Sequence, residues 1–238
     1  AVLALVTLLG RLQKFAGKEK QSWFDKKLFA QIMAIAIPSI LQQSVLSVGN
    51  LFVQGIVNQF GSAVVAGYSG AIKLNTFAIN IFMTLGSCLS SYTAQNIGAE
   101  QKDRVREGYR AVTIMVLGFA AVICLALELS GDSLAYLFLG ADGTPAAMQT
   151  AVSCMMFMGW FYCLIGFKMT ADGVLRGAGD MKLFTVANLV NLGIRVIVAV
   201  TMAPRCGIFM VWAAVPVGWT ANWLISYCRY RTGKWEKR

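Results

Sequence analysis

The sequence predicts an all-α membrane protein with six transmembrane helices. Its apolar stretches are the first reason, since no charged side chain occurs in residues 28–72, 74–99, 143–167 or 206–228. A bilayer core about 30 Å thick is crossed by roughly 20 mostly apolar helical residues, so each stretch is long enough to span it. Composition is the second reason. Here 57% of the residues are hydrophobic and 13% are charged, whereas roughly a quarter are charged in soluble domains.

Turn signals divide these stretches into helices. The first helix ends at the turn cluster of residues 58–62 (NQFGS) and the second at Gly98, because glycine adopts the left-handed conformation that closes a helix. Thr144 and Pro145 supply an N-cap and a first-turn proline for the fourth, and Gly179 lies in the turn before the fifth. The predicted helices are residues 28–57, 63–97, 102–128, 145–176, 181–203 and 207–229.

The basic residues fall in alternate gaps between these helices. Seventeen of the 21 lie before the first helix or after the second, fourth or sixth. One opposite gap holds Arg205 alone, and the longest is acidic, with Glu128, Asp132 and Asp142. Short cytoplasmic loops are enriched in Lys and Arg, so we expect the 11–27 loop and the C-terminus to be cytoplasmic in a multi-pass protein of a bacterial cell membrane. The net charge of +10 reflects this bias rather than nucleic-acid binding, because no soluble domain presents the basic residues.

Residues 1–10 are apolar but too few to span a bilayer. They begin without methionine and lack the positive flank and cleavage site of a signal peptide. We expect them to be the end of an earlier membrane helix, and the chain to be the C-terminal part of a longer polypeptide. The alternative is an anchor that lies in the membrane interface.

Polar side chains follow one face of each of the first two predicted helices, at the three- and four-residue spacing of an α-helix. On the first helix they are Gln43, Ser47, Asn50, Gln54 and Asn58. On the second they are Lys73, Thr76, Asn80, Thr84, Ser87, Ser91 and Gln95. Polar residues also join neighbouring membrane helices. Two nearly continuous stripes favour a wetted face instead, so we predict that they line a substrate and ion cavity.

Ionisable groups inside the helices are a stronger signal, because each costs at least ~2.5 kcal/mol near the bilayer centre and usually faces a cavity or a partner. Lys73 and Arg195 lie near the middle of the second and fifth helices, and we place both in the predicted cavity together with Asn191. Lys168 and Asp172 are four residues apart, which suits a structural ion pair. An offset of ~13 Å along the helix axes argues against a pair between Asp172 and Arg195.

Cysteine and histidine usage argues against metal and enzyme chemistry. The chain has six cysteines and no histidine, and no Cys-x-x-Cys pair is present, so a zinc site or a histidine-dependent catalytic site cannot be built. No nucleophile and base lie at a useful spacing. We therefore expect neither an enzyme nor a bound cofactor or metal.

Several segments resemble the C-terminal half of multidrug and toxic compound extrusion (MATE) transporters. They are residues 36–43 (AIPSILQQ), 57–61 (VNQFG), 93–99 (TAQNIGA, with Arg104 and Arg106 after it) and 175–180 (LRGAGD). The first two resemble the opening helix of that half, and the third resembles the end of its second helix and the following loop. The fourth resembles the loop after its fourth helix. In order and spacing, the resemblance covers roughly residues 11–230.

The resemblance implies a twelve-helix antiporter with two six-helix lobes around a central cavity. Such proteins export drugs, often organic cations, in exchange for Na⁺ or H⁺. The expected partners are a missing N-terminal lobe of the same polypeptide, the lipid bilayer and a small-molecule substrate. On this view residues 1–10 end a truncated helix, 11–27 form the cytoplasmic loop between lobes, 28–229 form the six-helix lobe and 230–238 form a basic cytoplasmic tail.

One departure concerns ion coupling, which the family often assigns to acidic residues. The opening helix here has Asn50 and Gln54 on its polar face and no acid, and Asp172 lies near the inner end of its helix. We therefore expect the coupling carboxylate in the missing lobe.

Two other functions stay open. One is export or flipping of lipid-linked or anionic substrates, which Lys73 and Arg195 favour; the other is a channel or scaffold whose polar stripes only join helices.

Overall fold

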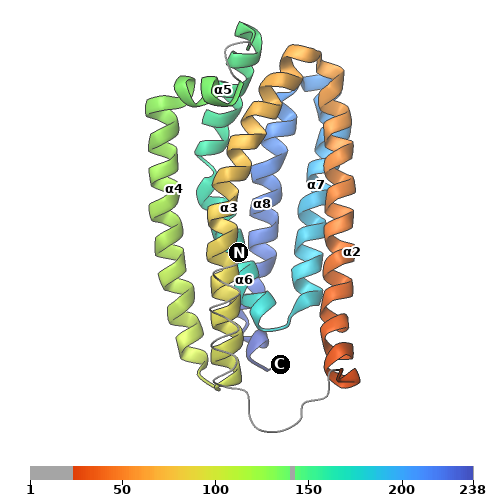
Figure 1. The fold of residues 1–238 in the computed structure, drawn as a ribbon, viewed down its shortest axis with the longest axis vertical. Helices are drawn as coiled ribbons and strands as arrows, with labels where there is room; N and C mark the ends of the chain where they lie inside the picture. Colours follow the sequence, from red (N-terminus) through yellow and green to blue (C-terminus); the bar gives the residue numbers. More distant parts are fainter. Residues whose placement is uncertain (1–23, 140–142, 238) are drawn as a thin grey trace. The chain divides into compact units, whose positions relative to one another are not determined.

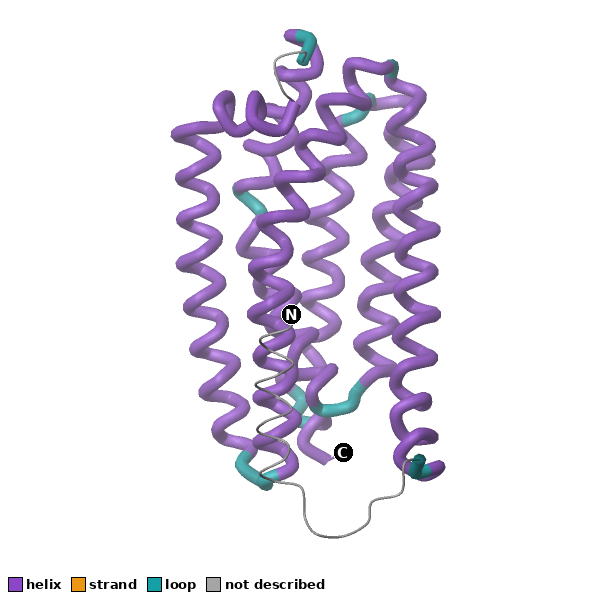
Figure 2. Tube along the Cα trace, in the orientation of Figure 1, coloured by secondary structure: helices purple, strands orange, loops and turns teal. Residues whose placement is uncertain are grey.

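The computed structural model describes residues 24–139 and 143–237, and all regular structure in these ranges is helical (Figure 2). The chain divides into two compact units, residues 1–37 and 38–238. The predictions for residues 1–10, and most of those for the 11–27 loop, lie outside the described residues.

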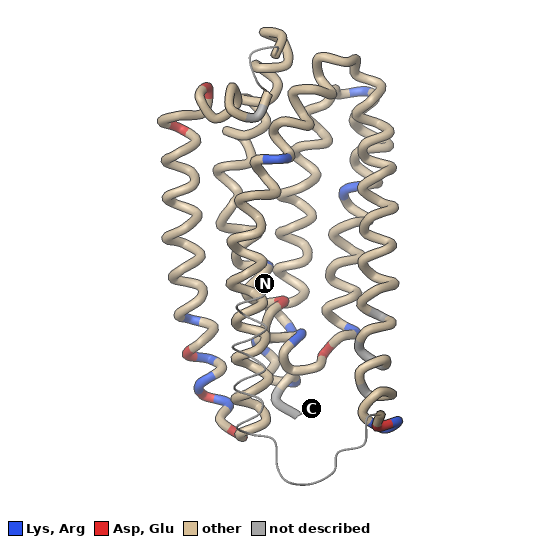
Figure 3. Tube along the Cα trace, viewed as in Figure 1, with Lys and Arg blue, Asp and Glu red and all other residues tan. Residues whose placement is uncertain are grey.

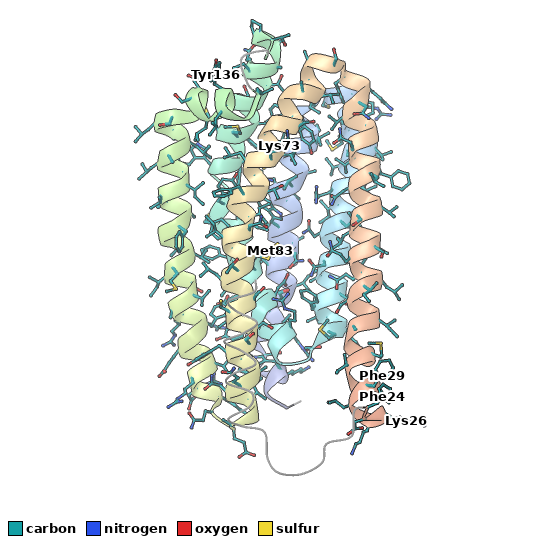
Figure 4. All side chains as sticks on the ribbon, viewed as in Figure 1. Phe24, Lys26, Phe29, Lys73, Met83 and Tyr136 are labelled. Carbon is teal, nitrogen blue, oxygen red and sulfur yellow. The ribbon has the colours of Figure 1, made fainter. Side chains whose placement is uncertain are left out.

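The described part of the first unit is the beginning of α2 (Lys26–Val57). The Asp25 carboxylate caps this helix by accepting hydrogen bonds from the backbone N–H groups of Lys27 (2.7 Å) and Leu28 (3.2 Å). The ring centroids of Phe24 and Phe29 lie 5.2 Å apart across the first turn (Figure 4). An acidic N-cap with apolar residues on either side of it is a strong helix start, which explains why α2 begins two residues before the predicted Leu28.

The second unit contains the rest of α2 and six further α-helices (Figure 1). These are α3 (Ser62–Gly98), α4 (Lys102–Leu139), α5 (Pro145–Gly159), α6 (Tyr162–Gly177), α7 (Met181–Cys206) and α8 (Phe209–Arg231). Two short 3-10 turns, η1 (Asn58–Phe60) and η2 (Lys234–Lys237), follow α2 and α8. The all-helical fold predicted from the sequence is confirmed, with differences in the third and fourth predicted helices.

The third predicted helix is longer than expected, because α4 continues to Leu139 rather than ending at residue 128. Its helical path is interrupted at Ser130, where φ is −139° and ψ is 21°. Serine and glycine pairs are a common cause of such kinks, and Gly131 follows directly. Beyond the kink, the side chain of Leu139 packs against α3 at Gly70.

The fourth predicted helix is bent by 53° between α5 and α6. The backbone N–H of Phe161 donates to the carbonyl of Met158 at 3.0 Å, a tighter turn than that of a continuous α-helix. No proline marks this bend in the sequence. The bend lies beside the α4 kink, since Gly159 faces the side chain of Leu127 and Gly131 faces that of Met156.

Four helical segments of the described residues are long and apolar enough to cross a membrane: Ser39–Phe60, Ser62–Gly98, Lys102–Leu137 and Met181–Cys206. The bent pair α5–α6 makes a fifth candidate. The sixth predicted span, α8, is long enough with 23 residues, but it is not apolar enough to be among these candidates. Its interior includes polar Thr220 and Asn222 among several tryptophans, which lowers its hydropathy.

Helix α6 packs against α3, α4 and α8, while α7 packs mainly against α8 (Figure 1). Glycines allow the backbones of α3 and α6 to approach closely. A Cβ atom at Gly173 would lie 2.5 Å from the carbonyl oxygen of Gly86, and one at Gly177 would overlap the carbonyl oxygen of Ser90. Close approach through small residues is a common way for membrane helices to associate. Arg176 reinforces this seam with hydrogen bonds to Ser87 (3.1 Å) and Ser90 (3.3 Å).

Basic residues concentrate towards one end of the second unit (Figure 3). They lie at the start of α4, around the α6–α7 turn and at the end of α8: Lys102, Arg104, Arg106, Arg110, Arg176, Lys182, Arg229, Arg231 and Lys234. Many large apolar side chains on the outer faces of the helices are exposed, for example Leu51 (71%), Ile114 (70%) and Leu129 (82%). A polar end and apolar flanks suit helices surrounded by lipid.

Replacing Gly173 by alanine should destabilise the protein by about 1–3 kcal/mol, because the added Cβ meets backbone rather than a flexible side chain. Unfolding in detergent, followed by circular dichroism, measures the change. Gly118→Ala on α4 is the matched control, because a Cβ there meets nothing within 4 Å, and it should be neutral or slightly stabilising. Equal stability of the two variants would contradict the close contact between α3 and α6.

Candidate functional site

A cavity of about 300 Å³ lies within the second unit between α2, α3, α7 and α8. Its polar lining residues are Asn50, Gln54, Asn75, Thr76 and Arg195. Its apolar and aromatic lining residues are Val53, Tyr68, Ile72, Ile79, Val215 and Trp219. The cavity therefore brings together four of the residues predicted from the sequence, which come from three different helices.

Asn50 and Gln54 reach the cavity from the polar face of α2. The side-chain amide of Gln54 donates a hydrogen bond to the Asn58 side chain at 3.0 Å, which orients it along the helix. Gly49 allows α2 to approach α7 here, because a Cβ at this position would overlap the side chain of Leu192. The predicted site residues Gln43 and Ser47 are exposed, lie outside the lining of this cavity and are linked by a 3.0 Å bond from the Ser47 hydroxyl to the Gln43 carbonyl.

The polar stripe of α3 lines two different hollows of the structure. Thr76 lines the cavity, and its hydroxyl donates to the Ile72 carbonyl at 2.8 Å. Asn80 and Thr84 instead lie along an open hollow of about 650 Å³. All residues lining that hollow belong to α3: Asn80, Met83, Thr84, Ser87, Cys88, Ser91, Tyr92 and Gln95. The lower part of the stripe is thus an exposed polar helix face.

Lys73 is exposed and is not among the residues that line the cavity. Figure 4 shows it nearer the upper end of α3 than Met83. Its neighbour in the stripe, Thr76, faces the cavity, and so does Asn75, which the stripe did not include. The Oδ1 atom of Asn75 is buried and has no hydrogen-bond partner among the described residues.

Among the described residues, Arg195 is the only charged one that lines the cavity. Its Nε–H group is buried and donates a hydrogen bond to no group in the described part of the chain. No acidic side chain lines the cavity with it, and the ion pairs found in the described ranges do not include Arg195. The cavity therefore presents an uncompensated positive charge beside the aromatic rings of Tyr68 and Trp219.

Lys168 and Asp172 lie 2.9 Å apart on α6 and are both buried, with side chains 7% and 5% exposed. The Lys168 ammonium also donates to the Asn188 side chain at 3.0 Å. Asp172 accepts from the Ser226 hydroxyl at 2.6 Å and from the Asn188 amide at 3.4 Å. The pair therefore joins α6 to both α7 and α8 through hydrogen bonds that satisfy its charges.

Asn191 lies between this network and the cavity. It is 8% exposed, and its Oδ1 atom is buried without a hydrogen-bond partner in the described ranges. Gly218 of α8 packs directly against it. Asn188, Asn191 and Arg195 are spaced by three and four residues, so one face of α7 carries polar groups from the ion pair to the cavity.

Three members of the network, Asn188, Asn222 and Ser226, were not predicted as site residues. Asn222 and Ser226 are fully buried, with their side-chain oxygens 3.4 Å apart, and the Asn222 amide nitrogen has no partner among the described residues. The three- and four-residue spacing that identified the first two stripes also occurs in these residues of α7 and α8, so it could have identified them.

All six cysteines are free, and the described residues contain no cluster of three or more His, Cys, Asp or Glu that could hold a metal ion.

A bundle of long apolar helices with a polar cavity and a buried ion pair defines a multi-pass membrane protein. The family model MatE matches residues 38–201, and the chain belongs to this family. The predicted resemblance is thereby confirmed. Because the family consists of transporters, the prediction that the chain is not an enzyme also agrees with this membership.

Relatives and solved structures agree with this assignment. The chain is 27% identical over 233 residues to the probable multidrug resistance protein YpnP of Bacillus subtilis, covering 95% of this chain and 50% of that protein. It is 24% identical to the probable multidrug resistance protein YoeA of the same organism, and the match covers 90% of this chain and 46% of YoeA. A mutant of the Vibrio cholerae MATE transporter VcmN has the same fold, with a TM-score of 0.84 and 18% identity, covering 99% of this chain and 54% of that one. The chain thus spans about half the length of these proteins.

Neutralising Lys168 alone, as Lys168→Met, should destabilise the protein by about 3–5 kcal/mol, because it leaves the buried Asp172 carboxylate without its counter-charge. The double variant Lys168→Met with Asp172→Asn should lose less than the sum of the two single variants. Thermal unfolding of the purified protein measures all three. Asp103→Asn, in the exposed pair with Arg106, is the control and should change little. Additive losses would mean that the buried pair is not coupled.

Proposed function

We propose that the chain forms one lobe of a secondary transporter that exports small organic molecules in exchange for Na⁺ or H⁺. The observation that carries this proposal is the cavity that gathers Asn50, Gln54, Thr76 and Arg195 from three helices of a MatE-family chain. Polar groups inside membrane helices mark substrate and ion pathways. Aromatic Tyr68 and Trp219 add apolar surface, so the site suits an amphiphilic solute. Two of its relatives carry names of multidrug resistance.

A second lobe is part of this proposal. Its support is the length of the relatives, since the chain covers 50% of YpnP, and the exposed polar hollow along α3. A polar helix face is stable in a membrane when protein or water covers it. We infer that the hollow faces the second lobe across a central passage. In the same arrangement, the basic end of the unit faces the cytoplasm.

Ion coupling requires a group that exchanges a proton or a sodium ion, and the described residues that line the cavity include no carboxylate. Two acids are buried among the described residues, Asp172 and Asp180. The two oxygens of Asp172 are occupied by Lys168, Asn188 and Ser226, and Asp180 is paired with Arg229. We therefore propose that the coupling acid belongs to the second lobe.

The anionic substrate class is a second candidate, and Arg195 is the observation that favours it. A guanidinium group in a cavity without acids attracts carboxylates and phosphates. A cationic dye would instead meet like charge on this side of the passage. The two candidate functions therefore differ in the charge of the substrate, and Arg195 is the residue that should distinguish them.

Reconstituted in liposomes, the complete transporter should move a fluorescent cationic dye against its gradient when a Na⁺ or H⁺ gradient is imposed. Transport should be saturable and should stop when an ionophore collapses the gradient. Dye fluorescence inside the liposomes measures the rate. Flux that is unsaturable, or that ignores both gradients, would favour a channel or scaffold and would overturn the proposal.

Arg195→Gln should separate the two substrate classes. If anions are carried, the variant should lose roughly tenfold or more in apparent affinity for an anionic substrate, because it loses a charged hydrogen-bond donor. If cations are carried, removal of the like charge should leave dye transport unchanged or raise it. Competition assays with anionic and cationic fluorophores measure both. Arg205→Gln is the control, because it makes the same change in net charge and Arg205 is exposed in the last turn of the same helix, outside the cavity lining.

A further inference from the structure

A second, smaller cavity lies at the basic end of the unit, where α4 begins and α8 ends. Its volume is about 260 Å³. It is lined by three arginines, two aromatic residues and a glycine: Arg106, Arg110, Tyr230, Arg231, Gly233 and Trp235. None of these residues lines the cavity around Arg195, and none is acidic.

Stacked aromatic rings fix the walls of this cavity. The ring of Tyr230 stacks on Tyr109 of α4, with centroids 4.3 Å apart, and on Trp235, with centroids 5.9 Å apart. The Trp235 indole N–H donates to the carbonyl of Tyr230 at 2.9 Å, and the residue is 1% exposed. The chain turns back through Gly233, whose φ of +64° is a conformation that glycine adopts readily. The segment after α8 is therefore packed beneath the helix end.

Two of the three arginines that line this cavity lack a counter-charge within the described residues. Arg229 is engaged elsewhere, because its Nε lies 2.6 Å from the buried Asp180 carboxylate. Arg106 lies 3.4 Å from Asp103, whose side chain is 93% exposed, so that pair is weakened by water. Arg110 and Arg231 have no ion pair within the described residues.

The face of α4 that carries these arginines continues as an apolar surface. Arg106, Arg110 and Ile114 are spaced by four residues, which aligns them along one face of the helix. Ile114 is 70% exposed and Leu117, in the next turn, is 48% exposed. The positively charged cavity therefore lies next to an exposed apolar surface formed by Ile114 and Leu117. This order matches that of a phospholipid, in which a charged phosphate group is joined to apolar acyl chains.

We propose that this arginine cavity binds a phosphate-bearing anion, namely the headgroup of an anionic phospholipid whose acyl chains lie along α4. Guanidinium groups bind phosphate oxygens in a bidentate manner, and basic cavities between membrane helices bind anionic headgroups. Tyrosine and tryptophan are enriched at the level of the headgroups. The volume is smaller than that of typical drug-sized sites, which suits a headgroup. This inference does not depend on the transport proposal.

Native mass spectrometry of the complete protein in detergent tests the inference. Phosphatidylglycerol should bind at concentrations at which phosphatidylcholine and glycerol 3-phosphate do not. The double variant Arg110→Gln with Arg231→Gln should weaken binding of phosphatidylglycerol about thirtyfold, since each basic residue near an anionic lipid contributes roughly fivefold. Arg104→Gln should leave binding unchanged, because Arg104 is exposed on the same helix but does not line the cavity.

Three results would overturn the inference. They are equal binding of phosphatidylglycerol and phosphatidylcholine, equal binding of phosphatidylglycerol and free glycerol 3-phosphate, and a double variant that binds phosphatidylglycerol as the unchanged protein does. Melting temperatures measured without added lipid check that the variants fold. If the double variant unfolds, the single variants Arg110→Gln and Arg231→Gln should each weaken binding about fivefold, and no weakening in either would equally refute the lipid site.

Discussion

Polar groups among apolar helices need partners inside the protein, because hydrocarbon offers them none. At the α6–α7–α8 junction this need is met: Asp172 accepts from Lys168, Asn188 and Ser226, and the buried charges are compensated. Further along α7, buried polar groups lack hydrogen-bond partners among the described residues. The Arg195 Nε is buried without one among the described residues, and at that level the helices enclose a cavity. The same constraint therefore explains why polar contacts join three helices and why Arg195, which has no ion pair among the described residues, lies at the level of the cavity.

Helix α6 holds the remaining helices around that cavity. It approaches α3 through Gly86 and Gly173, where backbone meets backbone, and it reaches α7 and α8 through the buried ion pair. Three of the four helices that line the cavity are thus positioned against α6, which itself contributes no lining residue. Within the second unit, α2 meets α7 mainly through side chains, with Gly49 against Leu192 and a 3.5 Å bond from the Thr185 hydroxyl to Gln42. The residues that α2 supplies, Asn50 and Gln54, therefore belong to a less closely packed helix.

Most helix positions could be predicted because their signals are local. The turn at residues 58–62, Gly98 and the Thr144–Pro145 start each lie where the structure ends or begins a helix. The spacing rule identified Asn50, Gln54 and Thr76, and the cost of a charge inside a membrane helix identified Arg195; all four line one cavity. The spacing could not show that Lys73 is exposed and lies outside the cavity lining, since a stripe with this spacing occupies a wide arc of the helix. It was applied to two helices only, so Asn188, Asn222 and Ser226 were missed. The kink at Ser130 and the 53° bend of α5–α6 have no proline to mark them and depend on tertiary packing.

The two interruptions of regular helix occur at the same level of the second unit. Gly131 in α4 faces Met156, and Gly159 before the α5–α6 bend faces Leu127. Ser130, just before Gly131, has non-helical backbone angles, and the chain bends by 53° between α5 and α6. The segments on one side of this level, residues 131–139 and 145–159, therefore follow other directions than the main part of α4 and than α6.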